Sequence, residues 1–343
     1  MSAFHRRVAA TALLAVLLLT FTGCGAPERR TATYYTYFDT VTTVTGYGSE
    51  KEFAAACAIV EDVLSRYHEA CDIYHQYSGK INACTVNLQA GNGPMAPEPE
   101  LLEVLAFGRE IYDRTDGMCN IAMGAVLSLW HDCRETALSG GAPSVPSAEA
   151  LQAAAEHCNI EDLILDMDAG TVELRDPAMT LDLGAVAKGY AAERAVQALT
   201  EAGYSGYALN LGGNVRTTGT KADGEPWVAG IQDPAGDDYL LRVALTDAAL
   251  VTSGSYQRYY ELDGVRYHHI ISPETLYPKN DLLSVSILAD DSGLADALST
   301  AVFNMPPEHG LNYVNQLEAV EACWVLTDGT IVYSDGFSDY ILP

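Results

Sequence analysis

The stretch Leu181–Tyr190 combines residue types that suit a phosphate-binding turn. It reads Leu-Asp-Leu-Gly-Ala-Val-Ala-Lys-Gly-Tyr, so an acidic residue ends an apolar run and Gly184 and Gly189 open a helical pattern. Glycines allow a close backbone approach, and the start of a helix offers free N–H groups to an anion. An ordinary strand-to-helix turn uses the same residues. The stretch alone therefore leaves both interpretations open.

A second group of candidate residues lies on a helix predicted over residues 293–303. Leu294 and Leu298 recur at helical spacing on its apolar side, while Asp296 and Thr300 fall on the opposite side. A carboxylate and a hydroxyl at positions i and i+4 suit an oxygen-preferring cation such as Mg²⁺. The alternative is a solvated polar face, which most amphipathic helices have.

Three shorter motifs follow candidate strands or close a hairpin: Asn210-Leu-Gly-Gly-Asn214, Thr252-Ser-Gly-Ser-Tyr256 and His268-His269. The first predicts a backbone cradle or a plain glycine turn, and the second offers hydroxyl donors before a strand. Adjacent residues in a strand point to opposite faces, so at most one of the two histidines faces a site. Acid–base or hydrogen-bonding chemistry suits that histidine better than chelation.

The charge of the chain limits its partners. The 343 residues contain 19 Lys+Arg against 46 Asp+Glu, a formal net charge of −27. Such a surface repels nucleic-acid backbones and anionic lipids, so we expect no nucleic-acid partner. A nucleotide substrate would need a local cation, and that requirement favours a bound metal.

The order of the predicted elements indicates an α+β fold, mostly antiparallel sheet with packed helices, in one domain. Helices are predicted at 53–67, 99–114, up to 158, 185–202 and 293–303. Strands are predicted at 34–47, 163–168, 171–176, 179–183, 207–211, 227–231, 239–245, 256–262, 265–271, 284–288, 324–326 and 331–333. No internal repeat or low-complexity segment interrupts the order.

The N-terminus resembles a bacterial lipoprotein signal peptide. Arg6 and Arg7 precede an apolar run that ends shortly before Cys24. The run of about 12 residues is too short to span a bilayer, which disfavours a membrane helix. We expect a signal peptide over 1–23, lipidation of Cys24, a tether over 24–33 and a folded domain over 34–343. The mature protein would sit on the outer face of the cell membrane, attached only by its lipid anchor.

Seven cysteines follow Cys24, an odd number without a CxxC pair. This argues against a disulfide framework or a zinc knuckle. We predict buried free thiols.

The order of the motifs resembles the ApbE family, the bacterial FAD:protein FMN transferases, from about Phe38 to Phe303. The matching stretches are Phe-Asp-Thr (38–40), Asp-Ile-Tyr-His-Gln-Tyr (72–77), Asn-Ile-Ala-Met-Gly-Ala (120–125), Asp-Leu-Gly-Ala-Val-Ala-Lys-Gly-Tyr (182–190), Asn-Leu-Gly-Gly-Asn (210–214), Gln-Asp-Pro (232–234), Thr-Ser-Gly-Ser-Tyr (252–256), His-Ile-Ile-Ser-Pro (269–273) and Ala-Asp-Ala-Leu-Ser-Thr-Ala (295–301). Such a resemblance implies the ApbE-like, T-fold-like architecture. Three positions depart from the family pattern: Asn120 and Ser272 each stand where Asp is frequent, and Ser299 matches a position that is often Asp or Ala.

The resemblance implies that FAD lies in a cleft and that Mg²⁺ grips its pyrophosphate. The metal ligands would be the Ala185 carbonyl, Asp296 and Thr300, and His269 is the candidate base. Together with the glycine and hydroxyl motifs above, the predicted cofactor-binding residues are Phe38, Tyr74, Met118, Cys119, Asn120, Asp182, Lys188, Gly212, Gly213, Ser253, Gly254 and Ile270.

The implied reaction is transfer of FMN from FAD to a Thr or Ser hydroxyl of a partner redox protein outside the cytoplasm, with release of AMP. An FAD pyrophosphatase would use water in place of that hydroxyl. A lipoprotein that only captures flavin is a third alternative, and the Asp296/Thr300 pair argues against it because simple binding does not need a catalytic metal.

Overall fold

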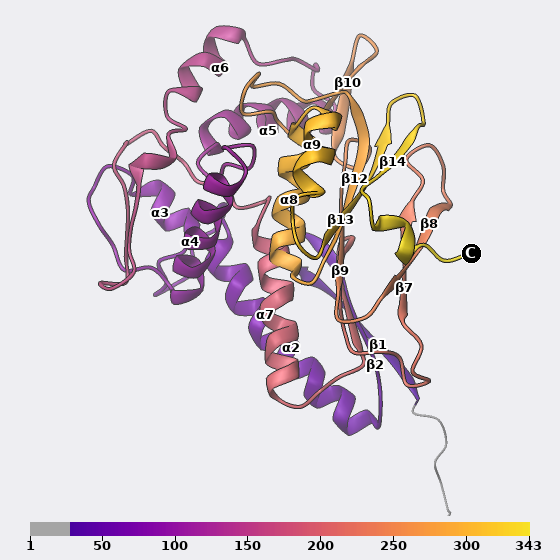
Figure 1. Ribbon diagram of the computed structural model, residues 1–343. Helices are drawn as coiled ribbons and strands as arrows, with labels where there is room; N and C mark the ends of the chain where they lie inside the picture. The colour runs from indigo at the N-terminus through magenta and orange to yellow at the C-terminus, as the bar shows by residue number, and fades with distance from the viewer. Residues whose placement is uncertain (1–27) are drawn as a thin grey trace, which may run out of the picture.

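A computed structural model describes residues 28–343 and contains one large antiparallel sheet (Figure 1). Its eight strands run in the order β1 (Arg29–Tyr37), β2 (Thr40–Tyr47), β5 (Tyr207–Leu211), β6 (Asn214–Thr218), β9 (Ala249–Gly254), β12 (Leu282–Ala289), β13 (Val320–Leu326) and β14 (Ile331–Tyr333). Neighbouring strands pair antiparallel throughout. The predicted α+β class with a mainly antiparallel sheet is confirmed.

Three long helices cover one face of this sheet (Figure 1): α2 (Glu50–Cys71), α7 (Ala187–Glu201) and α8 (Ser292–Asn304). Helix α2 begins with a capping box, in which the Ser49 side chain accepts from the backbone of Glu52 and the Glu52 side chain accepts in return. Its predicted apolar face is buried against the sheet and α7. Helix α8 is buried along almost its whole length, and this brings its polar residues into the interior.

A helical layer lies beyond α7 and α8, away from the sheet (Figure 1). It contains α3 (Ala83–Leu88), α4 (Pro99–Arg114), α5 (Gly124–Leu138), α6 (Ala148–Ala155), a 3-10 turn at Ile160–Asp162 and the hairpin β3 (Leu163–Asp166)–β4 (Thr171–Leu174). The hairpin β10 (Tyr259–Leu262)–β11 (Val265–His268) packs against α5 through Trp130, whose ring stacks on Tyr267 at 5.7 Å.

The other face of the sheet is covered by the hairpin β7 (Trp227–Gln232)–β8 (Tyr239–Leu245) and by the 3-10 turn Phe337–Tyr340. Helix α9 (Pro307–Val314) follows α8 and packs beside β13. The cysteines of the described residues are free thiols, as predicted, although Cys133 and Cys158 are only half-buried.

The predicted single strand over 34–47 is wrong, because the chain reverses within it. Phe38 and Asp39 both have left-handed backbones, with φ of 52° and 50°, and form the two-residue turn between β1 and β2. No glycine marks this turn in the sequence. The first strand also begins earlier than predicted: residues 29–33, assigned to the tether, pair with β2. Residues 1–23 and Cys24 lie outside the described part of the chain.

The predicted strand over 179–183 is also wrong, because this extended segment has no neighbouring strand. Instead, the Asn87 side chain accepts from Leu181 N at 2.7 Å and donates to Leu181 O at 3.0 Å. Asp182 N donates to Ile121 O at 2.9 Å. Helix α7 then begins at Ala187, two residues later than predicted. Strands β6 and β9 and helices α3, α5 and α9 were not predicted from the sequence.

Candidate functional site

The start of helix α7 meets the middle of helix α8 at Asp296. Gly189 N donates to Asp296 Oδ2 at 2.8 Å, and Lys188 Nζ lies 3.5 Å from the same oxygen. A Cβ on Gly189 would stand only 2.4 Å from the Asp296 Cβ and 2.3 Å from Ser292 O. Glycine at position 189 therefore permits the contact that joins the Leu181–Tyr190 stretch to the helix 107 residues downstream.

The Ala185 carbonyl lies just before the N-cap of helix α7. The helix begins at Ala187 with Val186 as its N-cap, so the N–H of Gly189 is one of the donors that a helix start leaves unpaired, and Asp296 accepts it. Among residues 28–343, no backbone N–H donates to Ala185 O. An unpaired carbonyl and a buried carboxylate at the same helix start are oxygen donors of the kind that Mg²⁺ binds.

Asp296 is 5% exposed, and this burial raises the pKa of its carboxyl group. The positive charge of Lys188 and the hydrogen bond from Gly189 act in the opposite direction. The hydrogen bond from Gly189 and the ion pair with Lys188 both engage Oδ2, and among residues 28–343 no hydrogen-bond donor reaches Oδ1. The charged form of Asp296 is thus only partly compensated by the protein.

Asp296, Thr300 and the Ala185 carbonyl fit a magnesium ion that keeps water or phosphate oxygens as its other ligands. The set provides one carboxylate, one half-buried hydroxyl a helical turn away, and one carbonyl. Within the described chain, no group of three or more His, Cys, Asp or Glu residues could hold a metal without such help. Residues 185, 296 and 300 therefore suit a metal shared with a phosphorylated substrate better than a metal held by the protein alone.

Ser299 is fully buried and is committed to the protein interior. Its hydroxyl donates to Asp296 O at 2.8 Å and lies 2.7 Å from the Ser253 hydroxyl. Ser253 and Gly254 are at the end of β9, not before a strand as predicted. This pair of hydroxyls fixes α8 to the sheet.

Asp182 lies at the other end of the Leu181–Tyr190 stretch. Its Oδ1 accepts from Gly184 N at 2.9 Å, and burial raises the pKa of its carboxyl group against the effect of nearby positive charges. The hydrogen bond from Gly184 N and the positive charges of Arg134 and Lys188 act in the opposite direction. That Asp182 and Lys188 contact FAD stays a prediction.

Two arginines near the site were missed in the sequence. Arg134, on α5, donates to His131 Nδ1 at 2.9 Å and is close enough to affect the titration of Asp182, Tyr74 and His269. Arg258, on the loop before β10, accepts from His269 N through its carbonyl at 3.1 Å. Arg258 follows the Thr252–Tyr256 motif by two residues, which was the only local signal for it. In a protein of net charge −27, these two arginines place positive charge near Tyr74 and His269, where the sequence predicts an anionic ligand.

The two adjacent histidines have different environments. His268 is buried, accepts from Ile270 N at Nδ1 (3.2 Å) and donates from Nε2 to Lys279 O (2.9 Å), so both ring nitrogens are occupied. His269 follows the end of β11, and its buried Nδ1 has no partner among the described residues. Burial is the main cause that lowers the pKa of His269 to about 3. His268 is a structural residue, and His269 is available for chemistry.

The remaining predicted cofactor residues differ in how they are exposed. Tyr74 is 57% exposed, with its ring 5.6 Å from that of His131, and Phe38 lies in the β1–β2 turn with its ring 5.5 Å from that of His68. Both can present a surface to a ring. Gly212 and Gly213, in contrast, form the two-residue turn between β5 and β6, with φ of 60° and 97°.

Three other predicted residues use their side chains inside the protein. Cys119 and Ile270 are 1% and 5% exposed and belong to the main apolar core. Asn120 donates to Cys158 O at 3.1 Å and accepts from Ala122 N at 2.9 Å. The Met118 carbonyl is also engaged, because it accepts from Asn304 Nδ2 at 3.2 Å.

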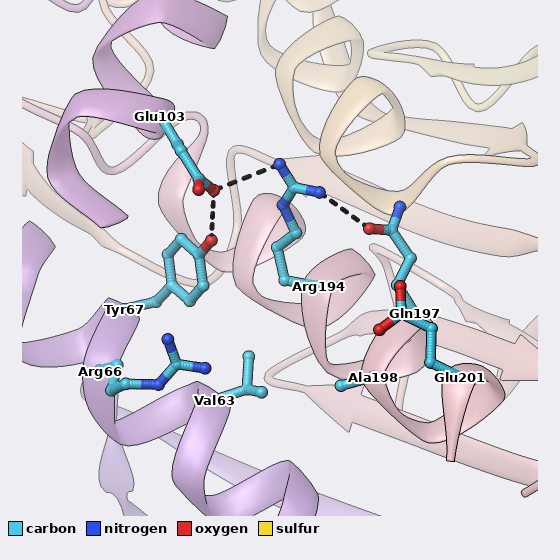
Figure 2. A pocket seen from close by; sticks show the side chains of 8 residues that line it. All are labelled: Val63, Arg66, Tyr67, Glu103, Arg194, Gln197, Ala198 and Glu201. Atoms are coloured by element: carbon cyan, nitrogen blue, oxygen red, sulfur yellow. Dashed lines mark hydrogen bonds and ion pairs between the residues drawn. The ribbon is translucent and has the colours of Figure 1, made fainter. Parts of the chain in front are cut away.

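A separate small hollow of about 210 Å³ lies on another side of α7, between α2 and α4 (Figure 2). Its lining residues are Val63, Arg66, Tyr67, Glu103, Arg194, Gln197, Ala198 and Glu201. Glu103 accepts from Tyr67 Oη at 2.6 Å and from an Arg194 amino group at 3.2 Å. None of the predicted site residues lines this hollow.

Comparisons with known proteins agree on one family. The model of the ApbE family matches residues 38–324. The FAD:protein FMN transferase of Treponema pallidum (strain Nichols) is 32% identical over 309 residues, which cover 85% of this chain and 84% of that protein. The FAD:protein FMN transferase of Klebsiella pneumoniae (strain 342) is 31% identical, covering 82% of this chain and 85% of that protein.

A solved structure has the same fold. The ApbE protein from Thermotoga maritima superposes with a TM-score of 0.80 at 29% sequence identity, covering 92% of this chain and 100% of that one.

Proposed function

Because this chain belongs to the ApbE family, whose relatives described above are FAD:protein FMN transferases, we propose that it transfers FMN from FAD to a hydroxyl group of a partner protein and releases AMP. The observation that carries the proposal is the convergence of Lys188, Gly189 and Asp296 at the contact of α7 and α8. That contact brings a cation and a partly compensated carboxylate to a helix start whose preceding carbonyl is unpaired, as a pyrophosphate with its metal requires.

In this proposal Asp296, Thr300 and the Ala185 carbonyl hold Mg²⁺. The ion would neutralise pyrophosphate charge that an acidic protein cannot neutralise with its own few cations. Lys188 would contact the phosphates directly. Its ammonium lies at the start of α7, where it donates to Gly184 O at 3.2 Å. Arg134 and Arg258 add positive charge on the side of Tyr74 and His269.

The transfer itself is an in-line displacement at phosphorus. The acceptor hydroxyl oxygen forms a bond to the flavin-side phosphorus, the bond from that phosphorus to the bridging oxygen breaks, and AMP leaves with the electron pair. The hydroxyl proton goes to His269. This side chain is neutral at pH 7 because burial lowers its pKa to about 3, so it has a lone pair available. Negative phosphate beside it would raise this pKa toward the working pH, which improves it as a base.

The proposed location rests on the N-terminal sequence, and the proposed acceptor rests on that location. We propose that Cys24 carries a lipid that attaches the protein to the outer face of the cell membrane, and that the acceptor is a redox protein on that side with a Thr or Ser at its flavinylation site. Among residues 28–343, no helix is both long and apolar enough to cross a bilayer. Membrane fractionation of Cys24→Ala tests the anchor: the variant should move to the soluble fraction, and retention in the membrane would contradict the proposal.

The activity is tested by mixing the purified protein with FAD, MgCl₂ and candidate acceptors, followed by intact mass spectrometry and nucleotide chromatography. We expect the acceptor to gain one FMN while AMP appears in equal amount, and His269→Ala to lose about 10²–10⁴-fold of the rate. AMP and free FMN without acceptor would identify a pyrophosphatase instead. Binding of FAD with no AMP under any condition would indicate flavin capture and overturn the proposal.

A further inference from the structure

Asn214 is a buried polar residue whose amide oxygen accepts a hydrogen bond but whose amide nitrogen donates none. It begins β6 directly after the Gly212-Gly213 turn and is 2% exposed. Its Oδ1 accepts from the Ser292 hydroxyl at 2.8 Å, whereas its buried Nδ2 has no hydrogen-bond partner among the described residues. An unpaired buried amide donor costs free energy, so a protein that keeps one usually has a use for it.

The unpaired Nδ2 lies beside Asp296. The point where a Gly189 Cβ would be is 3.1 Å from Asn214 Nδ2 and 2.4 Å from the Asp296 Cβ. The carboxylate is thus approached from α7 by Gly189 and from the sheet by Asn214.

A network of buried groups fixes this position of Asn214. Ser292, which anchors its Oδ1, donates its backbone N–H to Glu193 Oε2 at 2.9 Å. Glu193 also accepts two hydrogen bonds from Arg216, at 2.7 and 3.2 Å, and Arg216 lies on β6 two residues after Asn214. The first residue of α8, the middle of α7 and the start of β6 are therefore held together within a few residues of Asp296.

We propose that Asn214 is a positioning residue that keeps one oxygen of Asp296 directed to Gly189 and the other directed to the metal and phosphate. The inference rests on the proposed function, because it takes Asp296 as a ligand of Mg²⁺. In the Asn-Leu-Gly-Gly-Asn motif, the last residue, Asn214, then acts on the site by holding Asp296. The two glycines of the motif form the turn that leads into β6. Residues behind a metal ligand commonly change metal affinity 10–100-fold when they are replaced.

The test is a titration of the purified full-length protein with MgCl₂ alone, followed by thermal unfolding, for wild type, Asn214→Ala, Ser292→Ala and Asp296→Ala. We expect Asp296→Ala to lose the Mg²⁺-induced rise in Tm. Asn214→Ala should need on the order of tenfold more Mg²⁺ for the half-maximal rise. Ser292→Ala, which frees the amide to rotate, should shift in the same direction by less.

Thr217→Val is the matched control for lost stability. Thr217 lies on the same strand, is fully buried and donates to Ala248 O at 3.0 Å, away from Asp296. This variant should unfold at a lower temperature but respond to the same Mg²⁺ concentration as wild type. A merely structural role for Asn214 would give the same pattern in Asn214→Ala.

An Mg²⁺ response in Asn214→Ala and Ser292→Ala equal to that of wild type would overturn the inference. An absent response in the wild-type protein would overturn it together with the metal assignment. FMN transfer is measured separately: a protein that binds Mg²⁺ through Asp296 and Asn214 but transfers no FMN would support the positioning role and contradict the proposed function.

Discussion

Helix α7 contacts a carboxylate of a neighbouring helix on each of two sides, and the two carboxylates differ. On one side Asp296 of α8 accepts from Gly189 N and pairs with Lys188. On the other, Glu103 of α4 accepts from Arg194 and Tyr67 beside the hollow in Figure 2. The side chain of Asp296 is 7% exposed and that of Glu103 is 41% exposed.

This difference in burial decides what each carboxylate can do. Water shares the charge of Glu103, so its hydrogen bonds mainly hold α7 against α2 and α4 and contribute little free energy. Asp296 is removed from water and keeps one oxygen without a donor, which makes it an expensive residue unless a cation binds. The contact of α7 with Glu103 is thus structural, whereas its contact with Asp296 is the one we propose to be functional. Four measurements test this distinction.

The largest expected effect is on activity. Asp296→Ala should reduce FMN transfer by about 10³-fold or more, because it removes the charged ligand proposed for the metal. Glu103→Ala should reduce it by less than about threefold, since Glu103 contacts α7 through Arg194, on another side of the helix from Asp296. Initial rates at saturating FAD and MgCl₂ give the comparison. Equal losses in the two variants would remove the distinction between the two sides.

The second effect is steric. Gly189→Ala should destabilise the protein by about 2–3 kcal/mol and reduce Mg²⁺ binding, because its Cβ would overlap the Asp296 Cβ and Ser292 O. On the other side of the helix, Ala198→Ser adds one atom at the hollow and should change stability by no more than about 0.5 kcal/mol. Urea unfolding measures both. A Gly189→Ala protein of wild-type stability would show that the two helices can separate freely.

The third effect has the opposite sign. Asp296→Asn keeps an oxygen for the Gly189 N–H but removes a buried charge, so without metal the variant should be more stable than wild type by roughly 0.5–2 kcal/mol. Glu103→Gln should bring no such gain, because its charge is already hydrated. Thermal unfolding in the presence of a chelator tests this. A less stable Asp296→Asn protein would mean that Lys188 fully compensates the carboxylate.

The smallest effect concerns the pH dependence of stability and involves His269. The folded-state pKa of His269 is lowered to about 3, below its ordinary value of 6.5. Folding therefore favours the neutral ring, and the stability this provides is present above pH 6.5 and is lost as pH falls from 6.5 toward 3. His269→Gln should lose less stability than wild type between pH 7 and pH 5. Parallel urea titrations at these two pH values provide the measurement, and equal slopes would contradict the assigned burial.

Local sequence patterns predicted the elements whose periodicity matches their burial. Helices α2 and α4 and the polar group on α8 were found because apolar residues recur at helical spacing. The Phe38-Asp39 turn was missed because no glycine marks it and a bulky residue such as Phe38 rarely adopts a left-handed backbone, although Asp39 tolerates one. The segment 179–183 looks like a strand because it is apolar and buried, but its backbone is paired with a side chain, Asn87, rather than with a strand.

The family resemblance, the α+β class and the residue types of the site could be read from the sequence, because these depend on local order along the chain. The sequence also placed Asp296 and Thr300 one helical turn apart. The tertiary structure was needed to show that Gly189, at the start of α7, donates its N–H to Asp296. It likewise separated His269 from His268 and brought Asn214, Arg134 and Arg258 to the site. These choices depend on contacts between residues far apart in the chain, where burial and the number of available donors, rather than local spacing, set the free energy.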